Sequence, residues 1–462
     1  MINSVLVTQK PAKAVPIYSV TPKDYAAWLK KQPASLRNWL NATAFEVEPG
    51  KYRLVADSDG KISSVVACFS SGFQLWQWAN LSEKLPADLT YYPAEGVSDA
   101  LLQDAALGWL LGSYQFTQYK KGRTAHAKLC VGKKNIALAQ EMAESIFLTR
   151  NLINIPANDL GPSALAAQAK KLAKECGATY QEIVGDALLK KNYPTIHAVG
   201  RAAADAPRLI DLQWGNPKHK KLTIVGKGVC FDTGGLNIKT GNNMNLMKKD
   251  MGGAAFSLGL ARLIIKRKLP VRLRVLIPAV ENSVSGNAFR PQDIIRTRAG
   301  ITVEIGNTDA EGRLILCDAL YEADQEKPDL LLDFATLTGA SRVALGPDIP
   351  SFFTPSDALA TTVETFAKQH SDPLWRLPLW QEYEYFLHSH AADTDNAGGR
   401  YAGAIVAALF LKKFVTNTKD WLHVDMMAWN LRDRPGRPTG GEAQGIRGLY
   451  QLLEARYKRS HD

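Results

Sequence analysis

Residues 222–235 read LTIVGKGVCFDTGG, an apolar run that ends in an acidic, glycine-rich turn. Leu222–Phe231 is predicted to be an apolar strand, and Leu330–Leu337 has the near-continuous apolar character of a strand that is covered on both faces of a sheet. Lys227 lies inside the first of these predicted strands, where a buried ammonium group is costly unless it has a partner. Asp232 follows at the strand's end, and the glycines after it allow the backbone to approach a ligand closely. The stretch therefore predicts a sheet with polar groups at the carboxyl end of one strand.

Strands and helices alternate through the rest of this region. Further strands are expected at Val271–Val280, Ile301–Ile305, Leu330–Leu337 and Trp421–Met426, and helices at Gly253–Lys266 and Arg313–Gln325. Such alternation predicts an α/β fold whose mixed, largely parallel sheet is covered by helices on both faces. In folds of this kind, ligands bind at the carboxyl ends of the strands.

The first 150 residues predict a separate, smaller α/β domain. Tyr52–Ala56 and Ile62–Phe69 flank the turn DSDG at 57–60, which is typical of a hairpin. Asn135–Arg150 has the apolar spacing of a helix and leads into a polar stretch that contains proline. We therefore expect an N-terminal domain at 1–150, including this connecting helix, and a catalytic domain at 151–462.

The composition is that of an ordinary globular chain. Of 462 residues, 46% are hydrophobic and 22% are charged, which excludes a disordered, collagen-like or coiled-coil protein. The longest apolar run, Tyr401–Leu411, is about half the length of roughly twenty residues that a membrane span requires. The first ten residues, MINSVLVTQK, lack the layout of a signal peptide. These features predict a cytoplasmic protein with no membrane partner.

The net charge of +11 could indicate an anionic partner such as nucleic acid. The excess of basic residues is, however, spread along both parts of the chain and is not gathered in one tail. DNA binding or a scaffold role therefore stays open as an alternative or additional function.

Acidic residues gather at the predicted strand ends. They are Asp232, Asp250, Asp309 and Glu311, and we expect them at the mouth of one sheet beside Lys239 and Arg313. Four carboxylates in one cleft repel each other, and two divalent cations would resolve that conflict. Each group also has a structural explanation, as a helix cap, a helix-dipole carboxylate or half of a buried ion pair. The spacing alone leaves a metal site, a phosphate site and these structural roles open.

Three motifs together resemble those of one family. NTDAEGRL at 307–314 is similar to the signature of the leucyl (cytosol) aminopeptidase family. The segments VGKG at 225–228, FDTGG at 231–235, and MKKDM at 247–251 are similar to its other metal-site segment, and DFATLTGA at 333–340 to its substrate strand. The resemblance runs in order across roughly residues 150–450.

The resemblance implies a two-metal exopeptidase that releases single amino acids from peptides with a free α-amine, by attack of a metal-bound hydroxide on the scissile carbonyl. Two divalent ions, Zn²⁺ or Mn²⁺ with Mg²⁺ an alternative at one site, are implied. The implied ligands are Lys227, Asp232, Asp250, Asp309 and Glu311. Lys239 and Arg313 are the implied catalytic residues, with a bicarbonate held by Arg313.

Family resemblance also implies where the substrate lies. The implied substrate-binding positions are Met247, Thr336, Leu337 and Gly339. The chain departs from some members at Met427, where they have a small residue; a larger side chain would narrow the pocket. The family typically forms a hexamer of two stacked trimers, which is therefore expected for this chain. Some members also bind DNA, so a DNA-binding side role stays open.

Overall fold

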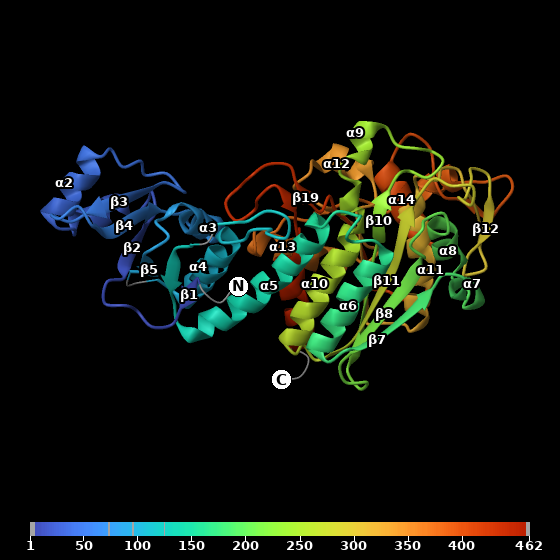
Figure 1. Ribbon diagram of the computed structural model, residues 1–462, viewed down its shortest axis with the longest axis horizontal. Helices are drawn as coiled ribbons and strands as arrows, with labels where there is room; N and C mark the ends of the chain where they lie inside the picture. Colours follow the sequence, from blue (N-terminus) through green and yellow to red (C-terminus); the bar gives the residue numbers. More distant parts are fainter. Residues whose placement is uncertain (1–4, 73, 95–96, 124, 459–462) are drawn as a thin grey trace. The chain divides into compact units, whose positions relative to one another are not determined.

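The computed structural model of the chain describes residues 5–72, 74–94, 97–123 and 125–458. The chain divides into two compact units, each described here by itself. The first unit comprises Met1–Glu144 with Arg432–Thr439, and the second comprises Ser145–Leu431 with Gly440–Asp462. The division falls within the long helix α5 (Lys133–Asn154) (Figure 1). The domain bounds 1–150 and 151–462 stay a prediction.

The first unit is built on a six-stranded sheet in the order β1-β6-β5-β2-β4-β3. Its strands are β1 (Leu6–Val7), β2 (Val15–Val20), β3 (Tyr52–Ala56), β4 (Ile62–Cys68), β5 (Thr90–Pro93) and β6 (Lys128–Cys130). Its helices include α1 (Tyr25–Lys30), α2 (Ala34–Ala42), α3 (Leu75–Lys84) and α4 (Asp99–Gly112). The predicted hairpin is present, because β3 and β4 pair antiparallel with Leu54 opposite Val65. The expectation of a small α/β N-terminal domain is confirmed.

The second unit contains a nine-stranded sheet in the order β16-β15-β18-β14-β9-β11-β8-β7, with β10 also paired to β11. The strands are β7 (Thr179–Val184), β8 (Arg208–Trp214), β9 (Lys220–Gly226), β10 (Gly228–Asp232), β11 (Val271–Asn282), β14 (Leu330–Ala335), β15 (Ser351–Phe353), β16 (Trp375–Arg376) and β18 (Trp421–Asp425). The central strands β11, β9, β14 and β18 are mutually parallel. Antiparallel pairs occur toward the edges, at β11–β8, β8–β7 and β18–β15. The predicted mixed, largely parallel sheet is confirmed.

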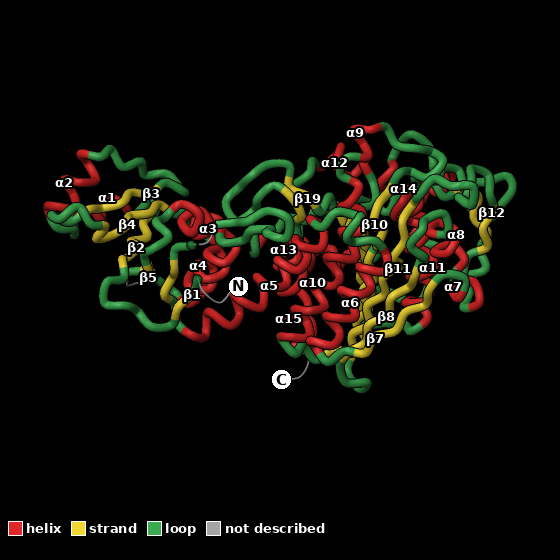
Figure 2. The backbone as a smooth tube through the Cα atoms, viewed as in Figure 1, coloured by secondary structure: helices red, strands yellow, loops and turns green. Residues whose placement is uncertain are grey.

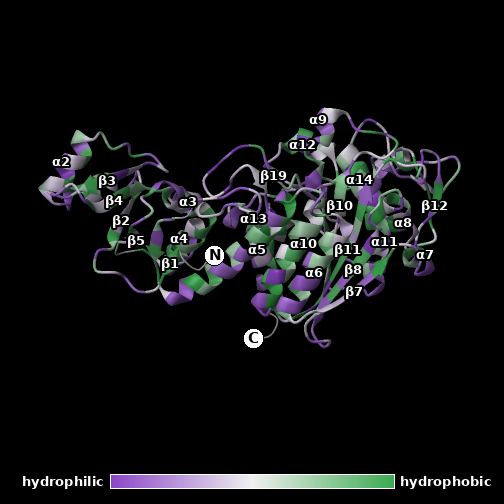
Figure 3. Cartoon of the chain, in the orientation of Figure 1, coloured by the Kyte–Doolittle hydropathy of each residue, from purple (hydrophilic) through white to green (hydrophobic). Residues whose placement is uncertain are grey.

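Helices cover both faces of this sheet, as Figures 1 and 2 show. One face is covered by α6 (Pro162–Cys176) and α10 (Gly252–Lys266), and the other by α8 (Pro194–Gly200) and α11 (Glu311–Gln325). Other helices of the unit are α7 (Ala187–Lys190), α9 (Gly241–Met244), α12 (Gly339–Leu345), α13 (Asp357–Gln369), α14 (Gly403–Lys412) and α15 (Ile446–Lys458). Because both faces are covered, strand residues such as Ile224, Val225 and Phe334 are fully buried. The largely hydrophobic colouring of β10 and β11 in Figure 3 reflects the same burial.

The prediction of one strand over Leu222–Phe231 is wrong in one respect, because the strand is interrupted at Lys227. The Lys227 amide still donates to Phe334 O on the neighbouring strand, at 2.9 Å. Its carbonyl oxygen instead accepts from the amide of Ala254, at 2.8 Å. That amide belongs to the first turn of α10, where N–H groups have no partner within the helix. The interruption therefore fastens the start of α10 to the middle of the sheet.

The strand expected near 301–305 is present, but it does not belong to the large sheet. It is β13 (Thr302–Glu304), the middle strand of a three-stranded sheet with β12 (Ile294–Arg296) and β17 (Thr394–Asp395). The prediction that the strand at 301–305 belongs to the same sheet as the other strands is therefore wrong. The loop after β13 nevertheless returns to the large sheet, because α11 begins at Glu311 and packs on β9 and β11.

Among the described residues, the structure has no helix that combines the length and apolar character needed to cross a membrane.

Candidate metal centre

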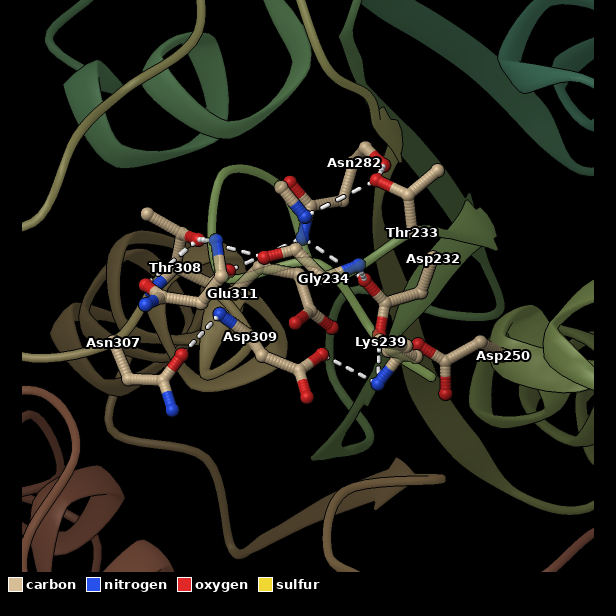
Figure 4. Close-up of polar contacts among 12 residues, drawn as sticks. Asp232, Thr233, Gly234, Lys239, Asp250, Asn282, Asn307, Thr308, Asp309 and Glu311 are labelled. Carbon is tan, nitrogen blue, oxygen red and sulfur yellow. Dashed lines mark hydrogen bonds and ion pairs between the residues drawn. The ribbon is translucent and has the colours of Figure 1, made fainter. Parts of the chain in front are cut away.

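Three carboxylates converge at the carboxyl end of β10. Each of Asp232, Asp309 and Glu311 offers an oxygen, and these oxygens lie within 4.8 Å of one another. Asp232 ends β10, Asp309 lies in the loop after β13, and Glu311 is the first residue of α11. Figure 4 shows the three side chains directed toward a common centre. The sequence analysis predicted this meeting, although two of the residues reach it from a different sheet.

Lys227 joins the cluster from the interruption between β9 and β10. Its Nζ lies 2.8 Å from Asp250 Oδ2 and 3.0 Å from Glu311 Oε1, and it donates to Thr336 O at 3.1 Å. Burial alone would lower the pKa of this amine, but the carboxylates of Asp250 and Glu311 raise it by more. In this arrangement Lys227 is an ammonium group that contacts two buried carboxylates and balances one of their charges.

Gly312 makes room for the Lys227 side chain. A Cβ atom at position 312 would lie 2.6 Å from both Cε and Nζ of Lys227, closer than real contacts allow. The glycine between Glu311 and Arg313 therefore has a steric reason, and it lets the buried amine reach the first turn of α11.

A second lysine bridges the other pair of carboxylates. Lys239 Nζ lies 2.8 Å from Asp232 Oδ2 and makes a short ion pair with Asp309 (Figure 4). Burial would lower the pKa of Lys239, but Asp232 and Glu311 outweigh it, so the net pKa lies above the ordinary value. Lys239 therefore keeps its positive charge inside the site.

The cluster holds more negative charge than the two lysines can neutralise. Burial and the neighbouring Asp232 raise the pKa of Glu311 to about 8, and the same two causes raise that of Asp309 to about 6. Four carboxylates face two ammonium groups, so ionisation of all four leaves two negative charges unbalanced. Divalent cations bound by oxygen ligands would supply the missing charge, so the donor set fits such ions.

Asp250 is buried within a 3₁₀ helix at Met247–Met251, directly before α10. Thr336 Oγ1 donates to Asp250 Oδ1 at 2.7 Å, and the carbonyl oxygen of Thr336 accepts from Lys227 Nζ. Thr336 follows β14, so the residue predicted to contact substrate lies directly beside the predicted ligands.

Arg313 is buried in the first turn of α11, two residues after Glu311. Its Nη1 donates to Asn396 O at 2.8 Å and to Ala397 O at 3.2 Å. Its Nε is buried and has no hydrogen-bond partner within the described part of the chain. Burial lowers the pKa of Arg313 to about 10, with Glu311, Asp425 and Asp395 opposing the shift. The structure thus places Arg313 near the carboxylates without a direct ion pair to them.

The other predicted substrate residues surround the turn between β14 and α12. Leu337 is half-buried and its amide donates to Asp425 Oδ1 at 2.9 Å, while Gly339 is exposed at the start of α12. A Cβ at Gly339 would meet no atom within 4 Å, so the space beside it is open. Met247 begins the 3₁₀ helix that carries Asp250, and Met427 is half-buried two residues after Asp425.

Comparison with known proteins agrees with this geometry. Residues 147–450 match the model of the cytosol aminopeptidase family, catalytic domain, and residues 15–132 match that of the M17 aminopeptidase, N-terminal domain. The chain belongs to the cytosol aminopeptidase family. It is therefore a metallo-aminopeptidase that acts on peptides, as the resemblance of the motifs implied.

Individual members of the cytosol aminopeptidase family resemble the chain over most of its length. A probable cytosol aminopeptidase of Sinorhizobium fredii is 38% identical over 390 residues, which cover 79% of this chain and 77% of the relative. The crystal structure of the cytosol aminopeptidase from Coxiella burnetii has a TM-score of 0.94 at 46% identity, covering 98% of this chain and 99% of that one. The bottromycin maturation enzyme BotP, solved in complex with Mn, has a TM-score of 0.87 at 30% identity, covering 96% and 100%.

Sequence reasoning missed several residues that support the site of this cytosol aminopeptidase. Asn282 ends β11, is fully buried, and donates to Asp232 Oδ1 at 2.9 Å and to Thr308 O at 3.1 Å. A polar residue at the end of an apolar strand was the available signal. Asp425 ends β18 and accepts bonds from the amides of Leu337 and Thr338. Asp425, too, is a polar residue at the end of an apolar strand, so the same sequence signal was available.

Lys249 was also missed, and no sequence pattern marked it. It is buried in the 3₁₀ helix next to Asp250. Burial and the nearby charge of Arg342 lower the pKa of Lys249 to about 7.

Proposed function

We propose that this cytosol aminopeptidase binds two divalent ions through Lys227, Asp232, Asp250, Asp309 and Glu311. The convergence of three carboxylate oxygens within 4.8 Å carries this proposal. Lys227 contacts Asp250 and Glu311 directly, so all five side chains belong to one connected group. When bound, the ions supply Lewis-acid activation of the scissile carbonyl and of a water molecule.

Lys227 has to change its protonation state to take this role. An amine offers a lone pair only when it is neutral, so its pKa must fall by about 3–4 units from roughly 10.4. Adjacent dications in a desolvated site favour the neutral amine strongly. Lys227, Asp250 and Glu311, which pair with one another here, would then hold the ions together.

Lys239 and Arg313 are proposed as the catalytic residues. Lys239 retains its charge beside Asp232 and Asp309, which suits it to stabilise negative charge that develops on the carbonyl oxygen. The buried Nε of Arg313, which lacks a hydrogen-bond partner among the described residues, fits a bound anion such as bicarbonate. A bicarbonate there would accept the proton of the attacking water.

Met247, Thr336, Leu337 and Gly339 are proposed to bind the N-terminal residue of the peptide. Support comes from Thr336, which bonds to Asp250, and from the open space beside Gly339. The free α-amine of the substrate would complete the site, so peptides with a blocked N-terminus should not react.

Three further properties extend the proposal. BotP contains Mn, so Mn²⁺ is a candidate ion here, with Zn²⁺ and Mg²⁺ as the other candidates. The relatives are named cytosol aminopeptidases, which supports a cytoplasmic location. A homo-hexamer of two trimers is proposed from family membership. These relatives' names describe only a peptidase, so the DNA-binding or scaffold alternative gains no support.

Metal content tests the ligand set directly. We expect two ions per chain in the purified enzyme by inductively coupled plasma mass spectrometry, and fewer than one in Glu311→Gln. Asp318→Asn is the matched control, because Asp318 is a buried carboxyl on the same helix that accepts from the amides of Thr195 and Arg298. A Glu311→Gln enzyme that retained both ions would contradict the ligand assignment.

A further inference from the structure

A buried lysine lies beside the proposed metal site without a hydrogen-bond partner. The Lys249 side chain is among the largest that are fully buried, and its Nζ makes no hydrogen bond or ion pair with any described residue. Lys227, which is equally buried, contacts two carboxylates and a carbonyl oxygen. Burying an amine without an acceptor is costly, so a protein retains one where a ligand supplies the acceptor.

Lys249 precedes Asp250 in the 3₁₀ helix, and charged groups of both the carboxylate cluster and α12 act on it. The charged groups that act on its amine are Arg342, Asp250, Lys227 and Asp425. Asp250 and Lys227 belong to the cluster, Asp425 holds the turn after β14, and Arg342 lies on α12. This is the region in which the proposed substrate residues gather.

The two nearby carboxylates are already engaged by other donors. Asp250 accepts from Thr336 Oγ1 and pairs with Lys227. Asp425 accepts from the amides of Leu337 and Thr338 and from Thr338 Oγ1, at 2.5–3.2 Å. Lys249 donates to neither carboxylate, although Asp250 Oδ2, beyond its ion pair with Lys227, has no hydrogen-bond partner among the described residues.

Arg342 adds a second unsatisfied donor, and its charge acts on the Lys249 amine. It lies on α12, three residues after Gly339, and its Nη1 is buried with no hydrogen-bond partner in the described ranges. The Lys249 amine and Arg342 Nη1 are thus two buried donors without an acceptor among the described residues, and a carboxylate could accept from both, with open space for it beside Gly339.

We propose that Lys249, with Arg342, binds the acidic side chain of an N-terminal glutamate or aspartate, so that this enzyme prefers peptides that begin with an acidic residue. The inference rests on the proposed function, because it assumes that the substrate's first side chain lies near Thr336 and Gly339. A carboxylate there supplies the missing hydrogen-bond acceptors, and an apolar or amide side chain leaves the Lys249 amine without a charged partner.

The test compares substrates that differ only in the first residue, with the full-length enzyme loaded with Mn²⁺. Fluorogenic amides of glutamate, glutamine and leucine are hydrolysed in parallel. We expect kcat/KM for the glutamyl substrate to exceed that for the glutaminyl one by about tenfold or more. Lys249→Met keeps roughly the length of the side chain and removes the amine. The ratio of glutamyl to glutaminyl kcat/KM should therefore fall to near one in this variant.

Lys248→Met is the matched control for Lys249→Met. Lys248 is the adjacent lysine, and its Nζ already donates to Asn154 O at 2.8 Å. Its substitution should leave the ratio of glutamyl to glutaminyl hydrolysis unchanged. A wild-type ratio near one, or a ratio that survives Lys249→Met, would overturn the inference.

Competition in the wild-type enzyme gives a second test that depends on no variant. Free glutamate should inhibit leucyl hydrolysis at concentrations about tenfold lower than free glutamine does, and equal inhibition would contradict the proposal. Acetate distinguishes a small free anion from a side chain: inhibition by acetate without any preference for glutamyl substrates would assign the site to free anions and overturn the proposal. Leucyl hydrolysis without a glutamyl preference would leave the proposed function standing, whereas no hydrolysis of any unblocked substrate would overturn both.

Discussion

Lys239 shows how one residue's surroundings fix its chemistry. It bridges Asp232 and Asp309, and Asp232 and Glu311 outweigh burial in setting the pKa of its amine above the ordinary value. A lysine that stays charged at neutral pH cannot act as a base, but it can stabilise an anion. Lys227, of the same residue type, is proposed to act as a neutral ligand once divalent ions are bound, because their charge would favour the neutral amine.

Lys239→Met should separate catalysis from metal binding. Because Lys239 is proposed to stabilise the developing oxyanion, its loss should lower kcat by about 100- to 1,000-fold. Metal content, measured on the same preparation, should stay near that of the wild type, because Lys239 is outside the proposed ligand set. A variant with full kcat would show that Lys239 is a structural counter-ion only.

Arg313→Met tests the proposed anion-binding residue in the same way. We expect kcat of the variant to fall while its metal content stays unchanged. Added bicarbonate should not restore kcat, because the variant lacks the guanidinium group that would bind the anion. In the wild type, removing dissolved bicarbonate should lower the rate. A wild-type rate that does not depend on bicarbonate would contradict the assignment of that anion to Arg313.

At the scale of elements, the site depends on how strand ends are fastened to one another. Asp425 at the end of β18 accepts the amides of Leu337 and Thr338, and so fixes the turn between β14 and α12. That turn carries most of the proposed substrate residues. The position of the turn, and with it substrate affinity, should therefore depend on a residue that contacts no substrate.

Asp425→Ala should raise KM by about fivefold or more and destabilise the fold by about 1–3 kcal/mol, because buried amides lose their acceptor. Asp324→Ala is the matched control. Asp324 accepts the amides of Thr416, Asn417 and Thr418 but lies at the far end of α11, roughly 20 Å from Glu311 by helix rise. Both variants should melt earlier, and only Asp425→Ala should change KM. Equal KM values would show that the turn is held by other contacts.

The spacing of apolar residues predicted most of the strands and helices. It failed where contacts between distant parts of the chain decide the structure. The apolar run at Leu222–Phe231 predicted a strand but not its interruption, because the carbonyl of Lys227 bonds to an amide of α10 that is distant in sequence. The alternation of strands and helices likewise could not show that β13 belongs to a separate sheet. Strand partners are set by long-range contacts, which a single sequence does not display.

The carboxylate cluster could be predicted because its residues follow strands and carry charge, whereas its supports could not. Asn282 and Asp425 act through hydrogen bonds to backbone and carboxylate groups that only the folded chain brings together. The proposed role of Lys249 was the hardest to predict, because it rests on the lack of a hydrogen-bond acceptor among the described residues around its amine.

For the whole molecule, metal binding and stability should be linked. Ions that bind only the folded state stabilise it, by about 2.7 kcal/mol for each site at a free concentration near 100 times Kd. Removing two ions also restores the repulsion among Asp232, Asp309 and Glu311. We expect chelation to lower the Tm by roughly 5 °C in differential scanning calorimetry. An unchanged Tm would mean that the carboxylates hold no ion under those conditions.

The proposed hexamer sets a second expectation at this scale. Six chains of 50.7 kDa give a particle of about 300 kDa by light scattering coupled to size-exclusion chromatography. A mass near that of a single chain would remove the hexamer from the proposal and leave the metal site unaffected.

Hydrolysis of a leucyl amide before and after chelation tests the central claim most directly. The claim is that the Asp232–Asp309–Glu311 cluster binds the ions that drive aminopeptidase activity. We predict that activity is lost on chelation, returns on adding Mn²⁺ or Zn²⁺, and is absent throughout with the N-acetylated substrate. Activity that survives complete removal of metal, or that cleaves the acetylated substrate equally well, would contradict the account.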